Sequence, residues 1–106
     1  MNVMGYYGLD GQPISDEEWA DLRDSRRRVV GRTVVSFDPY TWVSTALLGL
    51  DHGFGDGPPL IFETMIFGGE HNLWEDRYST LDAAERGHLR VVKALLAGID
   101  PNEEEL

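Results

Sequence analysis

Three acidic residues and a histidine stand close enough along the chain to indicate a metal site. Asp51, His52 and Asp56 fall within six residues of a glycine-rich stretch, GLDHGFGDGPP, and Glu63 lies in the apolar run that follows. Carboxylate oxygens and imidazole nitrogens are ligands that divalent cations accept. A small metal-dependent hydrolase built on Asp51, His52 and Glu63 is therefore one functional hypothesis.

The spacing of these residues favours a structural interpretation of the same stretch. Adjacent residues of a regular strand point to opposite faces, so Asp51 and His52 would not chelate one ion unless the strand ends before them. Neither an EF-hand spacing nor an HExxH pair is present. Glycines at positive φ and aspartates that bond nearby amides are typical of a wide hairpin turn. We therefore predict no metal and no cofactor at this loop.

Two other chemistries are excluded by what surrounds the loop. A phosphate-binding loop needs a helix N-terminus after it, but Gly57 is followed by two prolines, which lack amide donors, and then by another predicted strand. A nucleophilic site of Ser44 with His52 fails because eight residues of strand separate them by about 26 Å. No GxSxG elbow occurs. We predict no catalytic residue.

Two ionisable residues fall in apolar surroundings. His88 lies on the apolar stripe of the last predicted helix, where we expect a buried imidazole bonded to a backbone carbonyl or a tyrosine. Glu63, in IFETMIF, must be paired, solvated or protonated. Its predicted partner is an arginine from the second half of the chain, Arg77 or Arg90.

The charge of the chain bears on its partners. The 106 residues include 19 acidic and 9 basic ones and no cysteine, and no lysine or arginine stands between Thr33 and Asp76. This balance argues against direct binding of nucleic acid, whose phosphates need a basic footprint. It leaves open an acidic mimic of nucleic acid that inhibits a DNA- or RNA-binding enzyme. With neither a basic leader nor 18 consecutive apolar residues, the sequence predicts no membrane contact and a cytoplasmic location.

The hydrophobic pattern predicts one small α+β domain, residues 1–100, followed by a frayed acidic tail, residues 101–106. Ser15 and Glu18 form a capping box that starts a short helix ending near Asp24. A C-terminal amphipathic helix begins at Ser79 or Thr80 and ends at Gly98. Between them, β-branched and apolar runs predict an antiparallel sheet of three to four strands, at residues 29–37, 41–50, 60–67 and 77–78.

The two helices are predicted to pack on this sheet. The strands at 41–50 and 60–67 do not alternate cleanly between apolar and polar residues, so we expect both faces of the sheet to be covered at its centre. The edge strands of so small a sheet could pair across a two-fold axis, which makes a homodimer possible.

Two stretches of the chain resemble a family of small uncharacterised proteins from actinobacteria and their phages. They are STALLGLDHGFGDGPPLIFETMIFGG with the later DRYSTLDAAERGH, and the N-terminal YYGLDGQPISDEEW. The resemblance covers most of the chain, residues 6–92. It implies a phage or prophage accessory protein, and it implies no activity, substrate or catalytic residue.

The remaining hypothesis is a non-catalytic protein that binds a host or phage protein. Its predicted contact surface joins the long loop at residues 51–59 with the segment 68–76, which together are acidic and lack basic residues. Aromatic residues in loops are frequent interface anchors. The predicted partner-binding residues are Asp51, His52, Phe54, Asp56, Trp74, Glu75 and Asp76.

Overall fold

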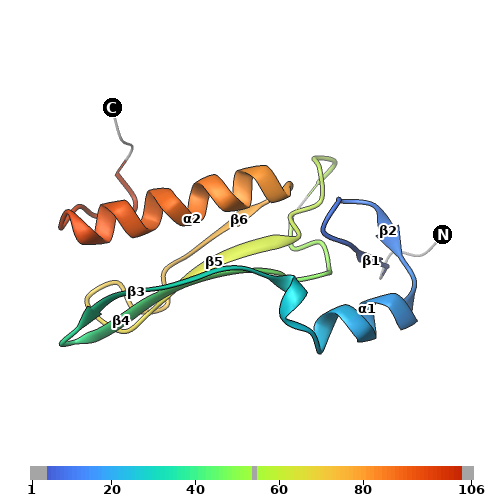
Figure 1. Cartoon of the computed structure of the whole chain (residues 1–106). Coiled ribbons are helices and arrows are strands. Elements are labelled where there is room, and N and C mark those ends of the chain that lie inside the picture. Colours follow the sequence, from blue (N-terminus) through green and yellow to red (C-terminus); the bar gives the residue numbers. More distant parts are fainter. Residues whose placement is uncertain (1–4, 54, 104–106) are drawn as a thin grey trace.

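The computed structural model describes residues 5–53 and 55–103, and it is an α+β fold with two antiparallel sheets (Figure 1). A two-residue hairpin, β1 (Tyr6–Tyr7) with β2 (Pro13–Ile14), leads into α1 (Asp16–Arg23). The predicted capping box is present: the Ser15 side chain accepts from the Glu18 amide, and the Glu18 side chain accepts from the Ser15 amide. Local chemistry thus determines where α1 begins.

The larger sheet is a four-stranded antiparallel meander. After a 3-10 turn at Arg26–Arg28, its strands are β3 (Val29–Phe37), β4 (Tyr40–Leu47), β5 (Phe62–Phe67) and β6 (Glu75–Tyr78), in that spatial order. The predicted strands at 41–50 and 60–67 extend too far, because β4 ends at Leu47 and β5 begins at Phe62. Strand β6 is two residues longer than the predicted 77–78.

Helix α2 (Leu81–Leu96) lies along one face of this sheet (Figure 1). Thr80 caps its first turn by accepting a hydrogen bond from the Ala83 amide. Burial alternates along β4 and β5, with side chains such as Val43 and Ile66 buried beneath α2 and Trp42 and Phe67 half-exposed on the other face. The prediction that both faces are covered is wrong, because α1 packs at the end of the sheet and not over its second face.

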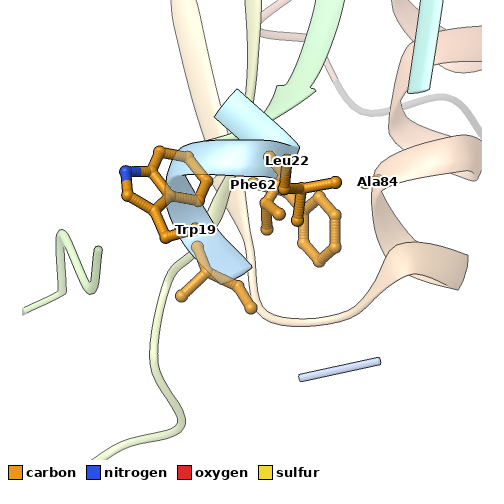
Figure 2. Close-up of a cluster of buried hydrophobic side chains, with 6 residues drawn as sticks. Trp19, Leu22, Phe62 and Ala84 are labelled. Atoms are coloured by element: carbon orange, nitrogen blue, oxygen red, sulfur yellow. The ribbon is translucent and has the colours of Figure 1, made fainter. Parts of the chain in front are cut away.

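Two hydrophobic clusters form the core. The first joins the end of the sheet to both helices and contains Trp19, Leu22, Leu47, Ile61, Phe62 and Ala84, four of which are labelled in Figure 2. Tyr6 stacks on Trp19 with ring centroids 5.1 Å apart, which attaches the N-terminal hairpin to this cluster. The second lies farther along α2 and contains Val43, Ile66, Val91 and Val92.

Packing continues beyond residue 100, where the tail is predicted to begin. Pro101 is fully buried, and its carbonyl accepts a hydrogen bond from the Arg90 guanidinium. Asn102 accepts a hydrogen bond from the Trp74 indole N–H at 2.8 Å. Residues 104–106 of the predicted tail lie outside the described residues. Within the described part of the chain, no helix has the length and apolar character needed to span a bilayer.

Candidate functional site

The predicted contact loop is shorter than its sequence indicates, because the hydrogen bonds between its two arms continue beyond the sheet. The Leu48 amide donates to the Ile61 carbonyl, and the His52 amide donates to the Leu60 carbonyl. Only residues 53–59 then form the open turn. Phe54, which we predict to be an anchor of the contact surface, lies outside the described residues, and Asp56 is exposed.

Asp51 closes this turn. One carboxylate oxygen accepts hydrogen bonds from the Gly53 and Leu60 amides, each at 2.8 Å. These two bonds hold the pKa of Asp51 below its usual value, since they stabilise the ionised carboxylate. The turn interpretation of Asp51 is therefore confirmed.

The two loops of the predicted contact surface do not form one end of the molecule. Strand β5 separates them, so the turn at residues 53–59 lies beyond the first residue of β5 and the loop at 68–73 lies beyond its last. Gly68 at that second loop lies against the Tyr40 carbonyl, beside the β3–β4 hairpin. The surface predicted from the two loops together is wrong for residues 68–73.

Strand β6 does bring several of the predicted residues together. His52, Gly53 and Leu60 line a hollow of about 300 Å³ with Glu75, Asp76 and Arg77. A second hollow, of about 670 Å³, is lined by Trp74, Glu75, Asp76, Arg90, Pro101, Asn102 and Glu103. Glu75 and Asp76 belong to both hollows. We call the residues that line these two hollows the β6 surface.

Four of the seven residues that line the second hollow are not among the contact residues predicted from the sequence. Arg90 comes from α2, and Pro101, Asn102 and Glu103 come from the segment after it, more than ten residues from Trp74 along the chain. Their position depends on the burial of Pro101 and on the Trp74–Asn102 hydrogen bond. Gly98, which ends the predicted C-terminal helix, has a positive φ of 72° and lets the chain change direction there.

Arginines neutralise much of the acid on and around β6. The Arg77 guanidinium contacts Glu63 at 3.1 Å and Glu75 at 3.2 Å, so the predicted pairing of Glu63 with Arg77 is confirmed. Arg90 approaches Asp76 at 3.9 Å. Two more pairs, Arg23–Asp24 and Arg86–Asp82, lie on the helices. Mimicry of nucleic acid needs unpaired carboxylates spaced like phosphates on one face, and this pairing weighs against it.

The same contacts bear on the hydrolase hypothesis. Asp51 already accepts two backbone amides, and Glu63 is paired with Arg77. Among the described residues, no three histidine, aspartate or glutamate side chains converge on a point where a cation could sit. Asp51, His52 and Glu63 therefore do not have the arrangement that a metal-dependent hydrolase needs.

His88 is buried between α2 and the sheet, and its two ring nitrogens contact threonine hydroxyls. Nε2 lies 2.9 Å from Thr33 Oγ1 on β3, and Nδ1 lies 2.8 Å from Thr45 Oγ1 on β4. Thr45 is also bonded to Thr64 on β5. The predicted partners, a carbonyl or a tyrosine, are wrong, because the two ring nitrogens bond to the hydroxyls of Thr33 and Thr45 instead. Thr45 and Thr64 are fully buried and His88 nearly so, and each ring nitrogen already has a partner within the protein, which favours a structural role for this network.

Acidification is expected to destabilise the protein through His88. Burial lowers the pKa of His88 below the usual 6.5, so the folded state disfavours the proton that the unfolded chain takes up. The stability contributed by neutral His88 is complete above pH 6.5 and falls as the pH drops from 6.5 toward the folded-state pKa. Thermal melting between pH 8 and pH 5 measures this loss. In a His88→Gln variant, which cannot titrate, the loss should be smaller; equal losses would contradict the assignment.

Comparison with known proteins adds no assignment to this site. No protein-family model matches the chain, and no curated protein and no solved structure matches it.

Proposed function

We propose that this protein acts by binding another protein, and that the β6 surface receives a basic segment of the partner. The observation that carries the proposal is that two neighbouring hollows share Glu75 and Asp76 as lining residues at the β6 edge of the sheet. Trp74 lines the larger hollow, and His52 lines the smaller one. Aromatic residues are enriched in protein interfaces, and complementary charge directs partner choice.

The chemistry of the lining supports a protein partner over a small molecule. Sites for small organic ligands are mostly apolar, with a few polar groups that orient the ligand. The larger hollow departs from this pattern, because four of its seven lining residues are charged, namely Glu75, Asp76, Arg90 and Glu103. Arg77 and Arg90 already contact Glu75 and Asp76, so a basic side chain of the partner would compete with or join existing ion pairs. We expect binding of this kind to weaken as salt is raised.

The resemblance of the sequence to proteins of actinobacteria and their phages supplies the proposed context. In that context the protein is a phage or prophage accessory protein located in the bacterial cytoplasm, and the partner is a host or phage protein. The groups that could have done chemistry are engaged elsewhere, Asp51 with backbone amides, Glu63 with Arg77 and His88 with two threonines. This supports a binding role without catalysis.

Affinity capture from an actinobacterial lysate tests the proposal. A Glu75→Gln/Asp76→Asn variant removes the two charges shared by the hollows, and we expect it to lose a partner that the unaltered protein retains, by about tenfold or more. A Glu17→Gln/Asp21→Asn variant removes the same charge from exposed positions on α1 and should retain the partner. Equal capture by all three forms, or specific capture by none, would contradict the proposal.

A further inference from the structure

We propose that two copies of this chain form a symmetric dimer by stacking the sheet faces that α2 does not cover. We call this surface the open face, and its apolar members are Val34, Tyr40, Trp42, Ala46, Met65 and Phe67. In the dimer each strand lies over the same strand of the second copy and runs in the opposite direction. The proposal is separate from the β6 surface, because Asp76 and Arg90 of that surface approach each other on the α2 side of the sheet.

The first observation is that the open face is apolar where a solvated face is usually polar. Antiparallel sheets with one face toward water commonly alternate apolar residues inward with polar residues outward. Here Trp42 stacks on Phe67 with ring centroids 4.7 Å apart, and Val34 and Tyr40 are 42% and 55% exposed. None of these four side chains belongs to the two core clusters of the described chain. Exposed apolar patches of this kind are typical of an interface.

The second observation is that the outward side chains of β4 change from large to small along the strand. Tyr40 and Trp42 stand near the β3–β4 hairpin, and Ser44 and Ala46 stand toward the other end. A two-fold axis perpendicular to the strands, level with Val43, places Trp42 over Ser44 of the second copy and Tyr40 over Ala46. Large side chains then fill the space above small ones, which is what close packing between facing layers requires.

The charges that flank β3 are complementary about the same axis. Thr33 pairs with Val43, so the axis is also level with Thr33. Arg28 stands five residues before Thr33, and Asp38 stands five residues after it. The axis therefore brings Asp38 of each copy to the Arg26–Arg28 turn of the other. Among the described residues, neither Asp38 nor any arginine of this turn is in an ion pair within the chain. Complementary charge of this kind selects the orientation of two partners.

The opposite orientation, with the strands of both copies running in the same direction, is less favourable. Its axis lies along the strands, so the β3–β4 hairpin of one copy would meet the loop at residues 68–73 of the other, and Asp38 would approach Glu70. Like charges that face each other disfavour an interface. Figure 1 shows α1 at the end of the sheet away from the β3–β4 hairpin. Antiparallel stacking therefore places the two α1 helices at opposite ends of the dimer.

Sedimentation or light scattering of the full chain at roughly 10–200 μM, a range that brackets weak and moderate dimers, tests the proposal. The unaltered protein is expected at twice the chain mass of 11.9 kDa. Ser44→Glu should raise the dimer dissociation constant at least about tenfold, because it places a carboxylate against Trp42 of the second copy. Circular dichroism should show this variant folded, since position 44 lies directly opposite Arg32 in the pairing of β3 with β4. Leu89→Glu is the matched control, because Leu89 is 59% exposed on α2, and it should leave the dimer intact.

A charge exchange tests the orientation separately. Asp38→Arg should weaken the dimer several-fold, because it turns a like charge toward the Arg26–Arg28 turn, and adding Arg27→Asp should recover most of the loss. Both altered side chains are exposed, so both variants should fold. An unaltered protein that is monomeric at about 200 μM would overturn the dimer. A dimer indifferent to Ser44→Glu, equal dissociation by Leu89→Glu, or no recovery in the double variant would overturn the interface described.

Discussion

Replacing Phe62 with alanine is expected to lower the free energy of unfolding by about 3–5 kcal/mol, the largest effect of any single core truncation in this protein. The Phe62 side chain is fully buried, and it belongs to the cluster in which Trp19 and Leu22 of α1 meet Ala84 of α2 (Figure 2). Truncation removes the transfer free energy of the ring and leaves a cavity that rigid strands cannot close. Small domains are stable by only about 5–15 kcal/mol, so this variant should be near the limit of folding.

Thermal and urea unfolding measure the effect, with Phe37→Ala as the matched control. Phe37, at the end of β3, is 82% exposed, so the same chemical change there removes little buried surface. We expect the Phe37 variant to unfold within a few degrees of the unaltered protein, and the Phe62 variant to unfold more than about 12 °C lower. A similar shift in both variants would mean that the cluster around Phe62 does not hold the two helices to the sheet.

Replacing Gly87 with alanine should destabilise the protein by about 1–3 kcal/mol or more, although alanine is the better helix former by about 1 kcal/mol. A Cβ atom at Gly87 would lie 2.3 Å from the ring of Tyr78 on β6. The absence of a side chain at this position allows the tyrosine to pack directly against the helix backbone. The Tyr78 hydroxyl is enclosed by the protein, and burial raises its pKa above the usual 10 more than the nearby Thr64 hydroxyl lowers it. Because the Tyr78 ring packs against the first hydrophobic cluster, it cannot move aside without losing that contact.

Two further variants isolate this contact, and unfolding free energies again give the measurement. Gly57→Ala is the control, because nothing lies within 4 Å of a Cβ placed at Gly57 and its φ is not positive. It should be neutral or slightly stabilising. In a Tyr78→Val background, Gly87→Ala should cost much less, since the clash is removed. A Gly87 variant as stable as the unaltered protein would show that α2 and β6 are farther apart than the structure places them.

Local features of the fold could be predicted from sequence because their causes are local. The capping box of Ser15 and Glu18 and the Thr80 cap of α2 depend on side chains within one turn of the backbone they bond. Antiparallel pairing of β4 with β5 follows from two apolar runs joined by a glycine- and proline-rich turn. The carboxylate of Glu63, flanked by apolar residues, needs a positively charged side chain nearby. Arg77 supplies it, because Arg77 stands directly opposite Glu63 in the pairing of β5 with β6.

The candidate site was predictable only in part. Glu75, Asp76, His52 and Trp74 are identified from sequence as contact residues and do line the β6 surface. Their grouping with residues 68–73 fails, because a loop at each end of β5 cannot form one surface. Arg90 and residues 101–103 are missed because nothing in their local pattern shows that the chain folds back onto Trp74 after α2.

By itself the sequence determined the fold class, the starts of both helices and the turn role of Asp51, because each depends on hydrogen bonds or hydrophobic periodicity within a short stretch of chain. The tertiary structure decided which face of the sheet is covered, which hydroxyls meet His88, and where the edges β3 and β6 lie. Those features arise from residues 11 to 55 positions apart, whose distances are fixed only when the strands pair and α2 docks. The β6 surface is of this second kind.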